Sequence, residues 1–139
     1  MQRQHLSKPV IKQSKLPKLI TLGLVLIIII FAVSLLPRGF SGDTSVIGKG
    51  IPVLVLVHDD NILQSGETMV VMNQIRNEYA ARLEFVVADI NTPEGRAFAN
   101  SSGFMPTALI FYSSTGQNLR VIYSPQTAES LRQALEVIF

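Results

Sequence analysis

The sequence predicts an α/β domain with a mixed four-stranded sheet, preceded by a single N-terminal transmembrane helix. The helix is predicted by an uncharged apolar run, 19–36, which reads LITLGLVLIIIIFAVSLL. The domain is predicted by residues 51–139, where short apolar runs alternate with segments of helical periodicity in the order βαβ, then α, then ββα. A βαβ unit requires a parallel strand pair and a terminal hairpin adds antiparallel strands. The sheet is therefore mixed, with helices on both faces.

The apolar run has the length of a membrane span. At a rise of about 1.5 Å per residue it covers roughly 27 Å, close to the hydrocarbon core of about 30 Å. Residues 1–39 carry six basic and no acidic side chains, whereas residues 40–139 carry six basic and ten acidic ones. The positive-inside rule then predicts a single-pass protein with a cytoplasmic N-terminus and a periplasmic or lumenal C-terminal domain. A cleaved signal peptide is the alternative, with Ala32-Val33-Ser34 as cleavage site, but the apolar run continues beyond it.

Four segments follow from this pattern: a basic cytoplasmic tail at 1–18, a transmembrane helix at 19–36, a linker at 37–50 and a domain at 51–139. The linker, PRGFSGDTSVIGKG, is rich in Gly and Ser and has no apolar periodicity. The tail is interpreted as a topology signal that also contacts anionic lipid headgroups. Its basic residues are spaced apart without aromatic side chains between them, so no nucleic-acid partner is expected.

Strands are expected at 53–57, 83–88, 107–112 and 119–123. The first is a continuous apolar run, typical of a central strand buried on both faces. A helix is expected from Ser65 as N-cap to about Ala81. A second, short helix is expected from Thr92-Pro93 to about Gly103, and a last one from Ser124-Pro125. The apolar stripe of that last helix is Ala128, Leu131, Leu135 and Ile138.

This order of elements, together with Phe104-Met105-Pro106-Thr107 before the third strand, resembles the thioredoxin superfamily over residues 51–139. The resemblance implies a thioredoxin-like fold, a cis bond before Pro106, and a peptide groove formed by residues 104–107. Pro106 is expected mainly to maintain the fold, with retained peptide binding as the alternative.

The resemblance also places Ile62-Leu63-Gln64-Ser65 where the family has its redox motif. Ile62 stands at the nucleophilic cysteine and Ser65 at the second one. Leu56 stands where the family has a buried acid, and His58 where it usually has an aromatic side chain. The redox motif is thus degenerate at each of its reactive positions.

The chain contains no cysteine. Disulfide exchange needs a thiolate and a second sulfur, so that activity is excluded, and we expect no enzymatic function and no cofactor. His58-Asp59-Asp60 is a metal-site alternative, but solvated loop residues are the favoured interpretation. Ser65 with His58 as base is a hydrolytic alternative, for which a helix cap is favoured. The methionines at 69, 72 and 105 are expected in packing and not as copper ligands.

We therefore expect a non-catalytic, redox-inactive, membrane-anchored protein that acts as an accessory or scaffolding subunit of a larger membrane protein complex. Its partners would be the lipid bilayer and an integral membrane protein complex. The alternative is a membrane-tethered peptide-binding chaperone or assembly factor that holds an extended peptide segment in the groove beside Pro106. A third possibility is an enzyme of unrecognised type. Fold alone does not decide among them.

Overall fold

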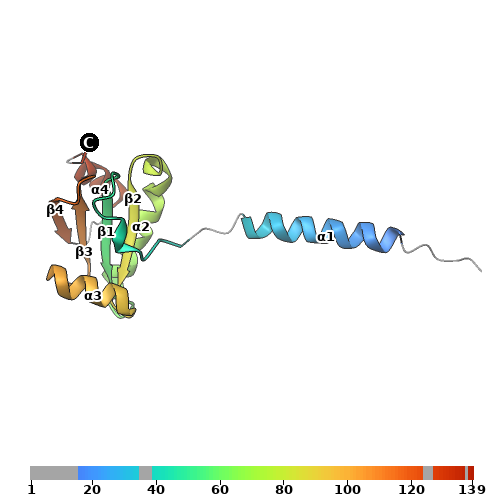
Figure 1. Ribbon diagram of the computed structural model, residues 1–139, viewed down its shortest axis with the longest axis horizontal. Helices are drawn as coiled ribbons and strands as arrows, with labels where there is room; N and C mark the ends of the chain where they lie inside the picture. The colour runs from blue at the N-terminus through green and yellow to red at the C-terminus, as the bar shows by residue number, and fades with distance from the viewer. Residues whose placement is uncertain (1–15, 35–38, 124–126, 137) are drawn as a thin grey trace, which may run out of the picture. The chain divides into compact units, whose positions relative to one another are not determined.

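The computed structural model describes residues 16–34, 39–123, 127–136 and 138–139 (Figure 1). The chain separates into two compact units, residues 1–38 and residues 39–139. The boundary falls inside the predicted linker, 37–50, and nearer its start than its end.

The first unit contains the helix α1 (Leu16–Ser34). Its side chains from Lys18 onward are exposed, and the Ser34 hydroxyl donates a hydrogen bond to the Phe31 carbonyl at 2.7 Å. Within the described residues, no helix combines the length and the apolar character that crossing a membrane requires. Most of the predicted tail, residues 1–15, lies outside the described residues, and so do Leu35 and Leu36 at the end of the predicted span.

The second unit is built on a four-stranded sheet. Its strands are β1 (Val53–His58), β2 (Glu84–Asp89), β3 (Ala108–Tyr112) and β4 (Asn118–Tyr123), in the spatial order β2-β1-β3-β4. β1 runs parallel to β2 and antiparallel to β3, and β3 and β4 form an antiparallel hairpin. The predicted mixed sheet is confirmed. In the parallel pair His58 lies opposite Asp89, so the carboxyl ends of β1 and β2 meet at one edge of the sheet.

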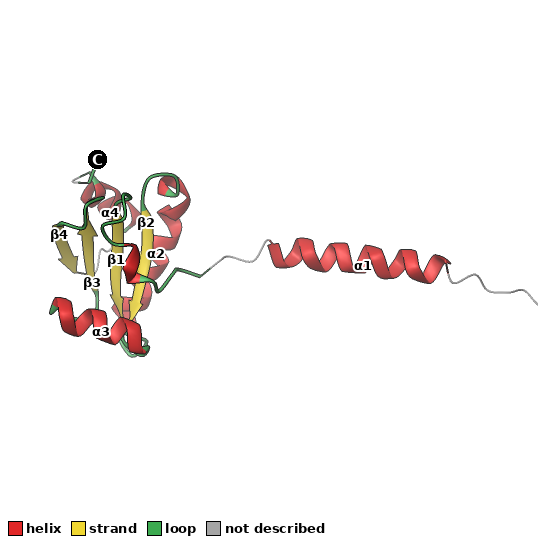
Figure 2. Cartoon of the chain, in the orientation of Figure 1, coloured by secondary structure: helices red, strands yellow, loops and turns green. Residues whose placement is uncertain are grey.

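Three helices cover the sheet: α2 (Leu63–Tyr79), α3 (Pro93–Ser102) and α4 (Ala128–Leu135) (Figure 2). Alternate side chains of β1 point to opposite faces, which creates two apolar clusters. Leu54 and Leu56 join α2 and α4 in one cluster, through Val71, Met72, Ile75, Leu131 and Leu135. Val53, Val55 and Val57 join the other cluster, against which Phe98 and Ala99 of α3 pack. Arg132 of α4 also binds Glu78 of α2 through two hydrogen bonds of 2.9 and 2.7 Å, which hold the pKa of Glu78 below its usual value.

Two helix starts were predicted from Ser/Thr-Pro pairs, with different outcomes. At α3 the prediction is confirmed, because the Thr92 side chain accepts a hydrogen bond from the Gly95 N–H, Pro93 is the first helical residue and Gly103 ends the helix in a left-handed conformation. At α4 the prediction is wrong. The N-cap is Thr127, which exchanges side-chain and backbone hydrogen bonds with Ser130 in a capping box. Ser124 and Pro125 lie outside the described residues.

The predicted linker, 37–50, is largely part of the domain. The centroid of the Phe40 ring lies 6.3 Å from that of the Phe85 ring. The guanidinium of Arg76 lies over the Phe40 ring, 4.5 Å from its centroid. Ser41 forms a parallel bridge with Val86, and its carbonyl accepts a hydrogen bond from the Val87 N–H at 2.8 Å.

The segment then crosses to the other face of the sheet through a short 3₁₀ helix, Thr44–Val46, capped by Asp43. There Val46 and Ile47 pack against the cluster that contains Val53. Residues 40–47 therefore wrap the free edge of β2, and we call them the strap. The linker interpretation failed because the strap's apolar residues contact different surfaces one at a time and leave no periodic pattern.

We expect Phe40→Ala to lower the free energy of unfolding of the domain. The loss should be about 1–3 kcal/mol, less than the 3–5 kcal/mol of a fully buried phenylalanine, because this ring is only half-buried. Val70→Ala, which truncates an exposed side chain on α2, is the matched control and should change stability by less than about 0.5 kcal/mol. Chemical denaturation of both variants measures the difference, and equal stabilities would show that the strap does not belong to the folded domain.

Candidate functional site

The residues at which the family resemblance places the redox motif, Ile62 to Ser65, lie at the start of α2, just beyond the end of β1. Ile62 is the N-cap, in an extended conformation and without a side-chain cap. Leu63 is 74% exposed and Gln64 is also exposed, whereas Ser65 is fully buried. The prediction that Ser65 is the N-cap is wrong. Ser65 lies in the first turn of α2, and its hydroxyl forms hydrogen bonds with His58 and Asp59, which precede the helix.

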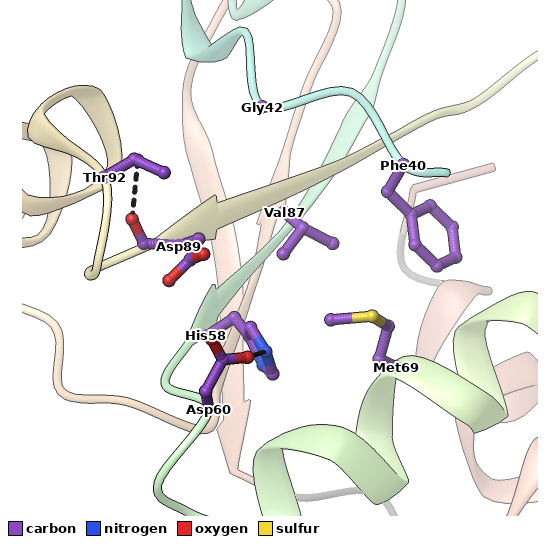
Figure 3. A pocket seen from close by; sticks show the side chains of 8 residues that line it. All are labelled: Phe40, Gly42, His58, Asp60, Met69, Val87, Asp89 and Thr92. Atoms are coloured by element: carbon purple, nitrogen blue, oxygen red, sulfur yellow. Dashed lines mark hydrogen bonds and ion pairs between the residues drawn. The ribbon is translucent and has the colours of Figure 1, made fainter. Parts of the chain in front are cut away.

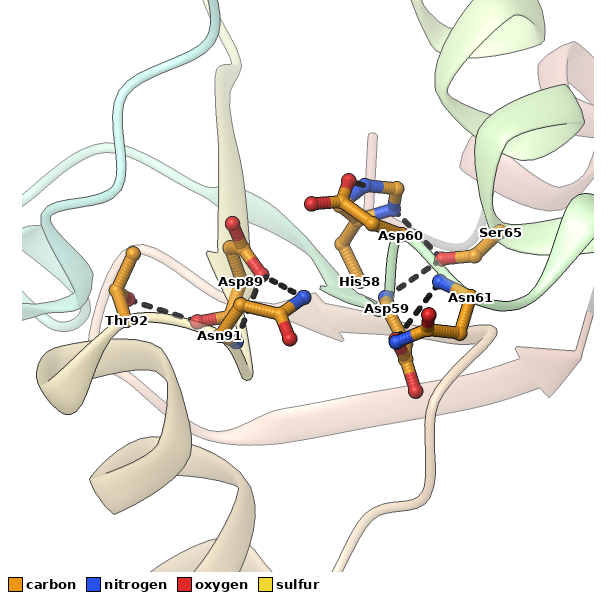
Figure 4. Close-up of polar contacts among 8 residues, drawn as sticks. All are labelled: His58, Asp59, Asp60, Asn61, Ser65, Asp89, Asn91 and Thr92. Carbon is orange, nitrogen blue, oxygen red and sulfur yellow. Dashed lines mark hydrogen bonds and ion pairs between the residues drawn. The ribbon is translucent and has the colours of Figure 1, made fainter.

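Ser65 is the centre of a buried hydrogen-bond relay (Figure 4). Its hydroxyl oxygen accepts a hydrogen bond from the Asp59 N–H at 3.1 Å and lies 2.7 Å from His58 Nδ1. His58 Nε2 lies 2.9 Å from Asp60 Oδ1. The Asp60 carboxylate only accepts, so Nε2 is assigned the ring proton and donates to it. In that tautomer Nδ1 accepts from the Ser65 hydroxyl, whose oxygen accepts from the Asp59 N–H. The relay joins the end of β1 to the first turn of α2.

The relay has the order of a hydrolytic triad but not its accessibility. A nucleophilic serine must reach a substrate carbonyl, and Ser65 has no exposed surface. His58 is also buried, at 7% exposure, and is the one polar residue of β1. A buried polar ring is costly unless it is hydrogen-bonded, so Ser65 and Asp60 stabilise His58 rather than activate it. The relay is structural.

The loop carboxylates do not converge on a metal site. Asp59 turns back to Asn61, whose backbone and side-chain amides both donate to its Oδ1 at 2.9 Å. These hydrogen bonds hold the pKa of Asp59 below its usual value. In the described part of the chain, no group of three His, Cys, Asp or Glu side chains is placed to hold a metal ion. Asp59 thus bonds Asn61, whereas His58 and Asp60 bond each other.

We expect Ser65→Ala to destabilise the domain by about 1–3 kcal/mol, because it removes a buried hydroxyl and leaves His58 Nδ1 and the Asp59 N–H without their partner. Ser101→Ala is the matched control, since it removes an exposed hydroxyl that bonds only the Phe98 carbonyl. Thermal and denaturant unfolding of both variants measure the difference. A Ser65→Ala domain as stable as the control would show that the relay contributes nothing.

The prediction of a cis bond before Pro106 is wrong. The described residues contain no cis peptide bond, so the Met105–Pro106 bond is trans. The chain instead reverses in a turn in which the Ala108 N–H donates to the Met105 carbonyl at 3.2 Å and Thr107 has φ +77°. Proline in the second position and positive φ in the third are the features of a type II turn. The Thr107 N–H then donates to the Val57 carbonyl at 2.8 Å, which aligns β3 on β1.

The four residues of the predicted groove differ in accessibility. Met105 is 70% exposed, while Phe104 is half-buried against the cluster that contains Val53. Pro106 and Thr107 are also half-buried. Only Met105 presents a largely free side chain, at the same end of the sheet as Leu63, because β3 begins where β1 ends.

Thr107 carries backbone strain that a glycine would remove. A β-branched residue at positive φ is a conformational outlier, and the left-handed conformation costs an L-residue about 1–2 kcal/mol. We expect Thr107→Gly to raise the free energy of unfolding by about 1 kcal/mol, after the entropic cost of glycine is subtracted. Thr107→Ala keeps a Cβ in the same geometry and should gain much less. A destabilised glycine variant would mean that the Thr107 side chain has a role that outweighs the strain.

A cavity with a volume of about 340 Å³ opens where β1 and β2 end (Figure 3). It is lined by Phe40, Gly42, His58, Asp60, Met69, Val87, Asp89 and Thr92. Asp89 Oδ1 accepts hydrogen bonds from the backbone and side-chain amides of Asn91, at 2.8 and 3.0 Å. α3 begins close to this edge, since a Cβ at Gly95 would overlap the Asp89 backbone. Thr92 Oγ1 also donates to the Asp89 carbonyl at 2.7 Å.

The architecture has solved counterparts. A thioredoxin from Thermus thermophilus superposes with a TM-score of 0.61 at 13% identity, covering 73% of this chain and 86% of that one. The fold is thioredoxin-like. An uncharacterised thioredoxin-like protein from Clostridium perfringens gives a TM-score of 0.57 at 13% identity, over 65% of this chain and 72% of that one. Trxlp from Edwardsiella tarda EIB202 gives 0.57 at 21% identity, over 66% and 88%.

No family profile matches the sequence, and no curated protein matches it. At these identities the structural similarity establishes the thioredoxin-like fold and leaves the activity open. The predicted fold is thus confirmed for the domain.

Sequence reasoning singled out His58 and Asp60 only as part of a metal-site alternative, and it missed the other residues that line the cavity, including Asp89 and Phe40. One signal was present. The same pattern occurs where each parallel strand ends. Asp59-x-Asn61 directly follows β1, and Asp89-x-Asn91 begins at the last residue of β2; in each the aspartate accepts hydrogen bonds from both amides of the asparagine. Such paired turns after adjacent parallel strands place polar groups side by side at one sheet edge.

Proposed function

We propose that this chain is a membrane-anchored, redox-inactive protein whose thioredoxin-like domain docks onto a larger membrane protein complex as an accessory subunit. The observation that carries the proposal is the state of the former redox positions. The resemblance places Ile62 and Ser65 at the family's two cysteine positions. Ser65 is buried in a structural relay, and Leu63, between these two positions, projects into solvent. In this proposal the domain offers a scaffold with an apolar surface and no reactive thiol.

The apolar surface supports a role in docking. Leu63 and Met105 are 74% and 70% exposed at the same end of the sheet, and Val70 on α2 is 59% exposed. We call Leu63 and Met105 the apolar end. Exposed apolar groups of this kind characterise protein interaction sites when they gather on one surface. The charged residues nearest in sequence, Asp59 and Asp60, give this end an acidic rim.

Membrane anchoring is supported by the sequence of α1 and its flanks. The helix is apolar on all sides after Lys18, which is typical of a segment surrounded by protein or lipid. The apolar run continues to Leu36, and the basic residues lie mainly before it. In this proposal the N-terminus is cytoplasmic and the domain lies on the opposite side of the membrane.

A membrane-tethered peptide-binding or assembly factor is the second candidate. It is favoured by exposed Met105, whose N–H has no acceptor among the described residues and is available to an extended peptide. Its carbonyl, however, is already used by the Ala108 N–H in the turn. A peptide would therefore gain one backbone hydrogen bond at Met105 and not two, which weakens this mode of recognition.

Purification of the tagged full-length chain from membranes in mild detergent tests the proposal. We expect one partner to co-purify in fixed stoichiometry, and Leu63→Glu or Met105→Glu to reduce its recovery at least fivefold, because each places a charge in the apolar interface. Ile51→Glu is the matched control. Ile51 is 50% exposed but precedes β1 and lies at the opposite end of the sheet.

The pattern of losses separates the two candidates. Loss of a stoichiometric partner in both apolar-end variants supports the accessory subunit. Sub-stoichiometric capture of varied unfolded chains, lost only on changing Met105, supports the peptide-binding factor. Full recovery of the partner in both variants would contradict docking through the apolar end.

A further inference from the structure

The cavity at the ends of β1 and β2 has one apolar and one acidic wall (Figure 3). Phe40, Met69 and Val87 form the apolar wall, and each comes from a different element: the strap, α2 and β2. Asp60, Asp89 and Thr92 form the polar wall, with His58 between the two. No lysine or arginine lines it. At about 340 Å³ it falls in the size range of small-ligand sites, about 300–1,000 Å³.

Hydrogen bonds fix both carboxylates of the acidic wall, although the Asp60 side chain is 71% exposed. His58, 7% exposed, donates through Nε2 to Asp60 Oδ1, while its other nitrogen is fixed by fully buried Ser65. This buried relay orients the Asp60 carboxylate and uses one of its oxygens. Asn91 in the same way occupies Oδ1 of Asp89. Each carboxylate keeps its second oxygen for a ligand.

We propose that this cavity binds a protonated primary amine carried on a short aliphatic chain. An ammonium group has three donors and no acceptor, which matches two carboxylates that accept only. Its methylene chain matches the wall formed by Phe40, Met69 and Val87, in the way that lysine stems lie on apolar surfaces. A metal ion fits less well, because the described residues offer no group of three metal-ligating side chains. The amine is a small free molecule or a lysine side chain, and the site does not depend on the docking role.

Titration of the full-length chain in detergent micelles with n-butylamine hydrochloride tests the site. In ¹⁵N–¹H correlation spectra we expect saturable shifts at the amides of residues 58–60 and 89–92. n-Butanol has the same chain without the charge, so at equal concentration it should not change the chemical shifts of these amides. Unsaturable shifts, or equal shifts with the alcohol, would overturn the proposal.

A pair of adjacent variants supplies the matched control. Asp60→Asn removes a cavity carboxylate but keeps an oxygen that accepts from His58, so the relay and the fold remain. It should weaken n-butylamine binding at least fivefold. Asp59→Asn makes the same change in charge one residue away, where the carboxylate bonds Asn61 and does not line the cavity. It should bind as the parent does. Equal weakening in both variants would mean general charge attraction and would contradict a defined site.

Two further probes distinguish the sources of the amine. Cadaverine represents a free aliphatic amine, and Nα-acetyl-lysine amide represents a lysine side chain. Tighter binding of cadaverine assigns the site to small amines, and tighter binding of the lysine derivative assigns it to a lysine of a partner protein. Failure of both to shift the amides of 58–60 and 89–92 would overturn the proposal.

Discussion

The whole domain depends on the burial of β1. All six of its residues are buried, and the strand is paired with β2 on one side and β3 on the other. A strand in this position needs cover on both faces, which α2 and α4 provide on one face and α3 and the strap on the other. His58 ends the strand inside this apolar environment. The hydrogen bonds with Ser65 and Asp60 are therefore a condition of the fold, since an unpaired imidazole there would be costly.

Several local features converge on the end of β1 because the sheet topology brings them there. The parallel pairing places Asp89 opposite His58, and the antiparallel pairing brings the turn at Pro106 and Thr107 to the same end. The strap closes the cavity from the side of β2 with Phe40 and Gly42. The result is one edge that holds a buried relay, an exposed apolar end and an acidic cavity. Reactive chemistry is not required to make such an edge useful in binding.

The parts of this structure that sequence reasoning predicted are those set by local patterns. The apolar run at 53–57, the Thr92-Pro93 helix start and the spacing of Leu131 and Leu135 each describe their own surroundings, and the described residues confirm them. The failures concern tertiary choices. Ser65 bonds a histidine seven residues away instead of capping its helix, and Phe40 finds its partner Phe85 far along the chain. The family resemblance implied a cis bond before Pro106, but the chain has a trans bond and a turn with positive φ at Thr107. No single-residue pattern in the sequence reveals that choice. The cavity was missed for the same reason, because its walls are brought together only by folding.

The relay also determines how the domain responds to its chemical surroundings. Where a dithiol sits at the start of this helix, oxidation and reduction add or remove a covalent cross-link, and stability follows the redox potential of the compartment. Here the same position is held by a hydroxyl, an imidazole and a carboxylate, none of which exchanges electrons. Glutathione, oxidants and reducing agents would leave this joint unchanged. With no cysteine in the chain, no disulfide can form or break within the domain, so the packing of α2 against β1 does not follow the local thiol balance.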